Sequence, residues 1–115
     1  MEFALLIYGD EKLWDNADPA ARAEMYRRHG TFMAMLQERG AARGGGELAV
    51  TTTATTLRHG EDDVSVTDGP FAETAEQFGG FYLIEAPDLA EAIEIAKQLP
   101  ADTVEVRPIV PSPDM

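Results

Sequence analysis

Two side chains, His29 and Asp68, have the types and settings that acid–base chemistry requires. His29 follows Met25 by four residues and precedes Phe32 by three, so on a helix its ring lies within an apolar stripe. An imidazole titrates near neutral pH and can act as a general base. The alternative is a structural core histidine whose ring nitrogens bond to backbone groups or to a carboxylate. Both interpretations of His29 stay open on the residues alone.

Asp68 is unusual because of the proline that follows it by two positions. Aspartate in a turn commonly accepts a hydrogen bond from the backbone N–H two residues later, but here that residue is Pro70, which has no N–H. The carboxylate must turn to Phe71, to solvent or to a distant group. A distant partner could be His29, whose tautomer and basicity a carboxylate would fix. The equally weighted alternative is that Asp68 bonds later amides of its own turn.

The residues around Asp68 extend this candidate site. Gly69 is predicted to supply a positive φ or a close approach, and Pro70 stiffens the turn. Phe71 either walls a pocket or plugs the base of a hairpin, and Glu73 is a weaker acid–base candidate that is more typical of a solvated position. With His29 and Asp68 as the predicted catalytic pair, the predicted pocket residues are Gly69, Pro70, Phe71, Glu73 and Tyr82.

Several kinds of chemistry are excluded by the residue types present. The chain has no cysteine, which removes thiol nucleophiles, disulfides and iron–sulfur sites. His29 and His59 lie too far apart in sequence to form a local metal-binding pair, and we expect no metal site. There is no nucleophile elbow, dinucleotide fingerprint or phosphate loop. Cofactor-free acid–base chemistry, or binding without chemistry, remains.

Length and charge narrow the class of protein further. The 115 residues, 44% of them apolar, predict one globular domain over residues 1–115. A formal net charge of −12 disfavours direct binding to nucleic acid or to a membrane surface, because phosphate groups would repel it. The first residues lack a basic region and are too short for a signal peptide or a membrane span. We therefore expect a cytoplasmic protein.

The elements that must position these side chains follow from apolar patterning and from start and stop signals. Apolar runs predict two strands that are buried on both faces. Asp18 before Pro19 marks the start of a helix that ends at Gly40, and Asp88 begins a second helix that Pro100 closes. The remaining segments are predicted as follows: strands at 3–8, 51–57, 64–67, 80–86 and 104–107, and a flexible joint at 44–46 before residues 47–50.

The resulting order, β-α-β(ββ)-β-α-β, predicts an α+β fold. Without its central hairpin it is the split βαβ of a ferredoxin-like sandwich, so we expect a hairpin inserted at 51–67. Two helices can cover only one face of the sheet, whereas strands 3–8 and 81–86 are apolar on both. A homodimer packed sheet against sheet would bury the second face. The rival explanation is that the inserted hairpin covers part of that face.

The stretch from Asp68 to Thr74, DGPFAET, is followed by Glu76-Gln77, Gly79-Gly80-Phe81-Tyr82 and Ile84. This pattern resembles the signature of the DGPF family of YCII-related proteins. Residues 5–10, His29-Gly30 and residues 104–108 are also similar to that family, so the resemblance covers nearly the whole chain. Ala75 departs from the family, in which a long polar residue is common.

The resemblance implies a ferredoxin-like, dimeric α/β-barrel-like fold. It also implies a His/Asp pair as the proposed active site of an otherwise mostly uncharacterised family, some of whose wider relatives eliminate chloride from aromatic compounds. DGPF proteins are often encoded beside extracytoplasmic-function sigma factors, which implies a regulatory or sensing role with a sigma-factor partner. The expected partners are thus a second copy, a small-molecule ligand and a sigma factor.

Overall fold

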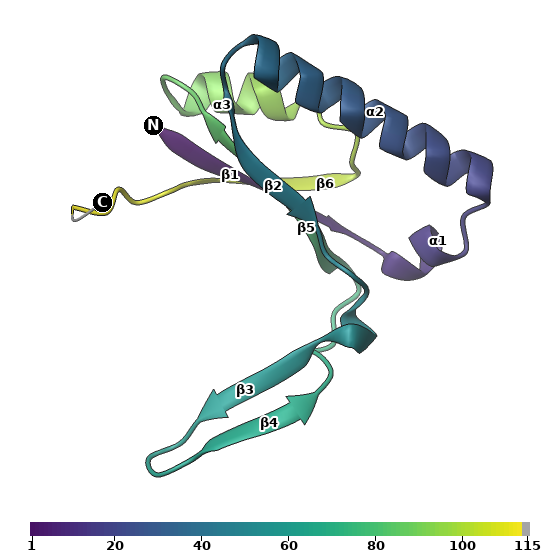
Figure 1. Cartoon of the computed structure of the whole chain (residues 1–115), viewed down its shortest axis with the longest axis vertical. Helices are drawn as coiled ribbons and strands as arrows, with labels where there is room; N and C mark the ends of the chain where they lie inside the picture. Colours follow the sequence, from purple (N-terminus) through teal and green to yellow (C-terminus); the bar gives the residue numbers. More distant parts are fainter. Residues whose placement is uncertain (114–115) are drawn as a thin grey trace.

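The computed structural model describes residues 1–113 and has an α+β architecture (Figure 1). In chain order its elements are β1 (Glu2–Gly9), α1 (Glu11–Asp15), α2 (Pro19–Glu38), β2 (Ala42–Glu47), the 3-10 turn η1 (Thr51–Thr53), β3 (Thr55–His59), β4 (Val64–Asp68), β5 (Gln77–Glu85), α3 (Leu89–Ala96) and β6 (Thr103–Pro108).

Four of the strands form one antiparallel sheet in the order β2-β5-β1-β6. This order is compatible with the predicted ferredoxin-like fold. Helices α2 and α3 lie on the same side of the sheet (Figure 1). The central strands β1 and β5 are the apolar runs that the sequence predicted at 3–8 and 80–86; β1 is one residue longer at each end, and β5 begins three residues earlier and ends one residue earlier.

The core lies between the helices and one face of the sheet. Phe3 and Leu5 of β1 and Ile84 of β5 are fully buried there. Phe3 lies opposite Ile84 in the register, and both pack with Leu36 of α2 in one apolar cluster. Alternate residues of a strand point to opposite faces, so this side holds the odd-numbered residues of β1.

The other face of the sheet has no helix over it. It carries Leu6 opposite Phe81, and Ala4 opposite Leu83, and all four side chains are only partly buried. The expectation that two helices cover one face alone is thus borne out by the packing of the chain. Apolar side chains on the second face are left for some other surface to cover.

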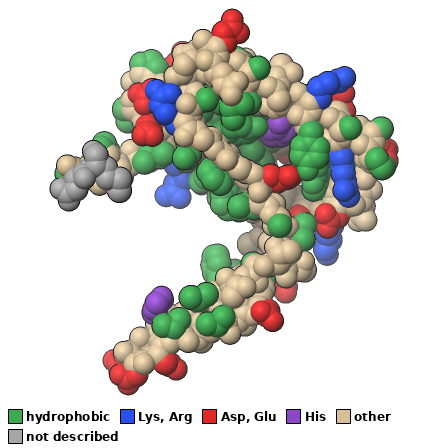
Figure 2. Space-filling model, in the orientation of Figure 1, with side chains coloured by type: hydrophobic (Ala, Val, Ile, Leu, Met, Phe, Trp, Pro, Cys, Tyr) green, Lys and Arg blue, Asp and Glu red, His purple; other side chains and the backbone are tan. Residues whose placement is uncertain are grey.

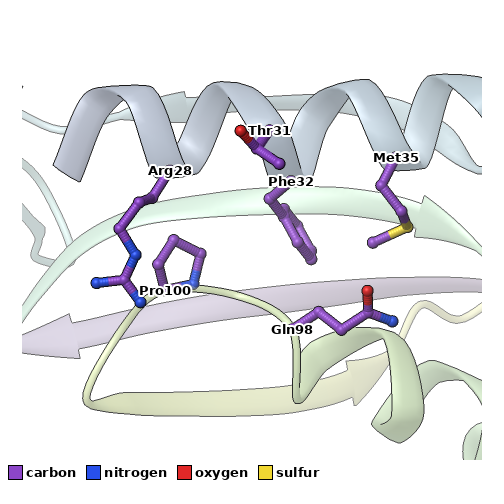
Figure 3. A pocket seen from close by; sticks show the side chains of 6 residues that line it. All are labelled: Arg28, Thr31, Phe32, Met35, Gln98 and Pro100. Atoms are coloured by element: carbon purple, nitrogen blue, oxygen red, sulfur yellow. The ribbon is translucent and has the colours of Figure 1, made fainter. Parts of the chain in front are cut away.

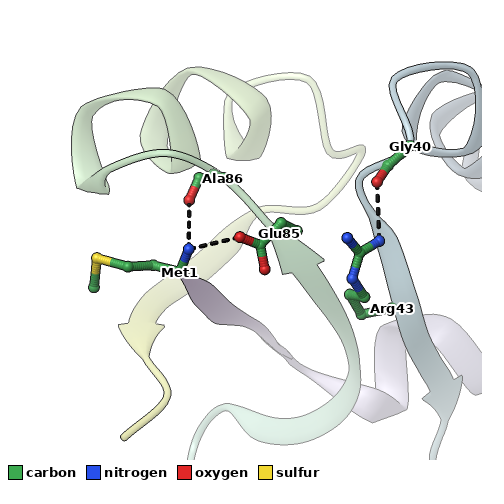
Figure 4. A network of polar contacts seen from close by, with 5 residues as sticks. All are labelled: Met1, Gly40, Arg43, Glu85 and Ala86. Carbon is green, nitrogen blue, oxygen red and sulfur yellow. Dashed lines mark hydrogen bonds and ion pairs between the residues drawn. The ribbon is translucent and has the colours of Figure 1, made fainter. Parts of the chain in front are cut away.

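The helix starts predicted from the sequence are found with their caps. The Asp18 carboxylate accepts from the backbone N–H of Ala21, and Asp88 accepts from that of Glu91. The N-terminal ammonium of Met1 pairs with Glu85 at 2.6 Å and donates to the Ala86 carbonyl (Figure 4). These contacts hold the start of β1 against the end of β5.

The predicted flexible joint at 44–46 is wrong. The three glycines form the middle of β2, which pairs with β5, and residues 48–50 that were expected after the joint lie outside the strands. Gly45 has a φ of +156°, and a Cβ built there would lie 2.6 Å from the Phe81 carbonyl oxygen. The glycines therefore let β2 approach β5 closely. Their role is to leave room for the neighbouring backbone and not to make the chain flexible.

Residues 51–76 leave the body of the molecule as a β3–β4 arm (Figure 1). Its strands form a separate two-stranded sheet. The strand predicted at 51–57 begins only at Thr55, because 51–53 form a 3-10 turn. The Cα radius of gyration is 16.4 Å, against about 13 Å for a compact domain of roughly 100 residues. The arm therefore does not fold back over the open sheet face.

Candidate functional site

A wide cleft of about 760 Å³ lies where α1, the first half of α2 and one end of the sheet meet. Its lining comes from all of these elements and from the loop before β6. The wall is mainly apolar and aromatic, with a few charged groups. Pockets of this size and composition are typical of small-molecule sites.

His29 lies in this cleft and pairs with Tyr82. The Nδ1 atom of His29 is 2.7 Å from the Tyr82 hydroxyl oxygen, and the two rings are stacked with 8° between their planes. Tyr82 is held in turn by the edge of Phe32, with ring centroids 4.9 Å apart. The predicted apolar setting of His29 is thus found, and its hydrogen-bonding partner is a phenol on β5.

Burial affects the protonation of both partners. It lowers the pKa of His29, an effect to which the charge of Arg28 adds and which the charge of Glu47 and the Pro100 carbonyl oppose. Burial also raises the pKa of Tyr82. A neutral imidazole and a protonated phenol are therefore favoured near neutral pH. With the ring proton on Nε2, Nδ1 accepts from the Tyr82 hydroxyl.

Aromatic side chains form much of the cleft around this pair. Trp14 of α1 packs edge-on against Tyr26 of α2 at a centroid distance of 5.4 Å. Arg22 lies 5.7 Å from the Trp14 ring centre and donates from Nε to the Trp14 carbonyl. Trp14 and Tyr26 both line the cleft. The short helix α1 is thus fixed as one aromatic wall.

Charged groups of both signs border the cleft. The Tyr26 hydroxyl donates to Glu47 at 2.9 Å, and this hydrogen bond is the main cause of a raised pKa of Tyr26. Arg28 lines both the cleft and a second hollow of about 240 Å³, where its side chain runs from α2 beside Pro100 (Figure 3). The lining also holds the carboxylates of Asp10, Glu11, Glu47 and Asp102, so Arg28 is the cationic group of the cleft that could meet an anionic part of a ligand.

Glu11 connects the cleft with the arm. Its carboxylate accepts from the backbone N–H of Thr51 at 2.9 Å and from the Thr51 hydroxyl. Its own backbone N–H donates to the side chain of Gln77 at 2.9 Å. Thr51 and Gln77 stand at the two ends of the β3–β4 arm, so one cleft residue fixes both ends.

The predicted residues 68–73 lie at the root of the arm, outside the cleft. Asp68 ends β4, and the described cleft lining passes from Val50 directly to Gln77. Phe71 is 77% exposed and lines neither the cleft nor the second hollow beside Pro100. Gly69 has the predicted positive φ, +99°. Within one chain, then, His29 meets Tyr82 and does not meet Asp68.

The Asp68 carboxylate makes no hydrogen bond with any group in residues 1–113, whereas Gly69 donates its N–H to the Ala54 carbonyl. The alternative that Asp68 bonds amides of its own turn is therefore not what the chain adopts. Pro70 and Glu73 are both exposed. The carboxylate of Asp68 stays available at the surface of the arm.

Sequence reasoning missed four residues to which the cleft gives a role: Glu11, Trp14, Tyr26 and Glu47. Asp10 before Glu11 is an N-cap that accepts from Lys12, and this signal could have located α1 and its aromatic residue. Nothing near Glu47 indicates that it meets Tyr26, which is 21 residues away. That contact depends on how β2 packs beside α2.

The described residues contain neither a metal-binding cluster nor a helix that could span a membrane. Within residues 1–113, no three histidine, aspartate or glutamate side chains gather in a way that could hold a metal ion. None of the described helices has the length and apolar content needed to cross a membrane.

Comparison with known proteins identifies the family of the chain. An uncharacterized protein of Rhizobium meliloti (strain 1021) is 36% identical over 114 residues, a match that covers 95% of this chain and 92% of the relative. The model of the YCII-related domain matches residues 1–112. The chain, with its DGPF turn at the root of the arm, therefore belongs to the YCII-related domain family.

Proposed function

We propose that the protein is a cofactor-independent acid–base enzyme that acts on a small aromatic anion in the cleft. The observation that carries this proposal is the 2.7 Å contact between His29 and Tyr82 on the wall of the cleft. The reaction class is proton abstraction, as in an isomerisation or an elimination. His29 is the general base, and the neutral imidazole that burial favours is the form that can accept a proton.

The proton path follows from the pairing of the two rings. The Tyr82 oxygen takes a proton from the substrate while its own proton moves to Nδ1 of His29. The imidazole thereby gains one positive charge, and the charge of the substrate falls by one. Arg28 supports binding of the substrate's anionic group. Trp14 and Tyr26 support stacking of an aromatic ring.

Binding can be measured with benzoate, the simplest aromatic carboxylate, because Trp14 is the single tryptophan of the chain and lines the cleft. We expect benzoate to change the tryptophan fluorescence, and Arg28→Met to weaken its binding about tenfold or more. Arg27→Met is the matched control, since exposed Arg27 pairs with Glu24. Equal affinities for the two variants would contradict the role of Arg28.

Turnover requires a natural ligand, which mass spectrometry of natively purified protein can identify. We then expect His29→Gln to keep the affinity for that ligand and to lower turnover by about 100-fold or more. If the wild-type protein shows no measurable turnover and His29→Gln lowers the affinity for the ligand, the result would instead support a binding protein.

A ligand-sensing or regulatory module is the second candidate, and the contacts of Glu11 favour it. Glu11 lines the cleft and bonds to Thr51 and Gln77 at the ends of the arm. A ligand that displaces the carboxylate would release the arm, and a protein partner such as an extracytoplasmic-function sigma factor would respond to the change. We expect residues 51–76 to exchange their amide hydrogens faster when the ligand is bound, because the arm is released, and unchanged exchange would contradict this candidate.

We also propose a homodimer, supported by the open face of the sheet. Leu6, Phe81 and Leu83 lie there without cover from either helix or from the arm. Burial of each large apolar side chain contributes roughly 1.5–3 kcal/mol. Sedimentation equilibrium at micromolar concentration measures the oligomeric state directly, and a monomer at that concentration would contradict the proposal.

A further inference from the structure

The β3–β4 arm has one apolar face that nothing in its own chain covers. Directly paired residues of an antiparallel sheet share a face. Leu57 lies opposite Val66, and His59 lies opposite Val64. The three apolar side chains are 56%, 67% and 44% exposed for Leu57, Val66 and Val64, and we call them the apolar arm face. Figure 2 shows hydrophobic side chains gathered along this arm.

Asp68 lies on the same side of the arm, because it pairs with Thr55 two positions before Leu57. A surface that packs against the apolar arm face would therefore meet the Asp68 carboxylate as well. Burying a carboxylate beside apolar groups is unfavourable unless a cation or a hydrogen-bond donor meets it. The surface that docks here must combine an apolar wall with a cationic or hydrogen-bonding group.

The cleft has this combination. Its wall includes Met25, Met33 and Trp14. Arg28 and His29 are the groups of the lining that can meet a carboxylate, and they stand beside the acidic residues Asp10, Glu11, Glu47 and Asp102. The arm cannot enter the cleft of its own chain, because Glu11 fixes both of its ends at the cleft rim. A second copy has no such restriction. Each chain thus presents a surface that fits a different surface of an identical chain.

We propose that the β3–β4 arm of one copy docks in the cleft of a second copy, with the apolar arm face on the cleft wall and Asp68 facing His29. The site of each chain is then completed by a carboxylate from its partner. This inference deepens the proposed function, since it rests on the same His29 and assigns Asp68 as its positioning residue. It also accounts for an apolar arm that a two-stranded sheet could not bury alone.

The test follows the titration of His29 in mixed dimers and requires no ligand. Wild-type chains labelled with ¹⁵N-histidine are mixed with a tenfold excess of unlabelled Asp68→Asn chains, and the imidazole signals are followed against pH by NMR. His29→Gln identifies the signal of His29, since the chain has only two histidines. In these dimers the labelled His29 faces an arm that lacks the carboxylate, while its own chain keeps Asp68.

We expect the labelled His29 to titrate about one pH unit lower in the mixture than in the wild-type dimer, because a nearby carboxylate favours the charged imidazole. Glu47, Arg28 and Tyr82 face His29 in both samples, so their effects cancel. Unlabelled Glu73→Gln chains are the control and should cause no shift. A labelled His29 that titrates as in the wild-type dimer would overturn the proposal.

A second variant tests the docking itself. Leu57→Asp with Val66→Asp places charge on the apolar arm face, and since both side chains are exposed, circular dichroism should confirm that the chain folds normally. We expect the dimer dissociation constant to rise at least tenfold in sedimentation equilibrium. An unchanged constant would overturn the docking. Neither measurement uses turnover, so a failure of the proposed catalytic role would leave both results interpretable.

Discussion

The body of the molecule and its β3–β4 arm are both built from antiparallel strand pairs, but the body buries its apolar side chains and the arm exposes them. In the body, Phe3, Leu5 and Ile84 are fully buried between the sheet and its helices. In the arm, every residue of β4 is exposed, and the apolar side chains of β3 and β4 face outward. A two-stranded sheet is marginal in water without a covering layer. The body therefore folds by its own contacts, whereas the arm is covered only in the dimer proposed above.

The largest expected effect contrasts a leucine from each region. Leu36→Ala removes a fully buried side chain and should lower the free energy of unfolding by about 2–5 kcal/mol. Leu57→Ala in the arm should lower it by less than about 0.5 kcal/mol in dilute solution, and by more as concentration rises and copies associate. Denaturant unfolding at two protein concentrations measures both. Equal losses at every concentration would show that the arm belongs to the chain's own core.

Two glycines sharpen the comparison at the level of the backbone. Gly45→Ala in β2 would place a Cβ 2.6 Å from the Phe81 carbonyl oxygen, and we expect a loss of about 2 kcal/mol or more from overpacking and strain. Gly69→Ala at the arm root has a φ of +99° but nothing within 4 Å of the Cβ, so only the backbone strain of roughly 1 kcal/mol remains. Thermal unfolding of the two variants should rank them in this order, and the reverse order would contradict close approach as the role of Gly45.

Two hydroxyl deletions compare a hydrogen bond from each region. Tyr82→Phe removes the partner of His29 and should cost about 0.5–1.5 kcal/mol of unfolding free energy. Thr56→Val removes the hydrogen bond from the Thr56 hydroxyl to the Gly69 carbonyl, with a smaller expected loss because strand residues of the arm are easily solvated. If Thr56→Val proved the more destabilising of the two in denaturant unfolding, the arm root would be more tightly built than the cleft.

The smallest expected effect is a dependence of folding stability on pH that arises from His29 in the body of the molecule. Burial lowers the pKa of His29 in the folded chain, so below about pH 6.5 the unfolded chain binds more protons than the folded one. The stability of wild type relative to His29→Gln should therefore be greatest above pH 6.5 and fall as the pH decreases through the folded pKa. Unfolding of dilute protein between pH 5 and pH 8 measures this difference, and a difference that grows toward low pH would contradict a buried neutral imidazole.

Local signals in the sequence located most of the fold. The caps at Asp18 and Asp88 and the apolar runs of β1 and β5 act within a few residues, so their elements could be predicted. Alternation along β1 also assigned each side chain to its face. The triple glycine was misread because its role depends on the Phe81 carbonyl of another strand, which no local rule includes.

What the sequence by itself determined is the set of reactive residues, the faces of the central strands and the resemblance carried by residues 68–74. Only the tertiary structure decided which of these residues meet. His29 and Tyr82 lie 53 positions apart in the chain and come together because α2 packs on the face of the sheet that bears Tyr82. Asp68 is held away from them because the arm leaves the body at the cleft rim, where Glu11 bonds to Thr51. Side-chain type is a local property, whereas contact between distant residues depends on how whole elements pack.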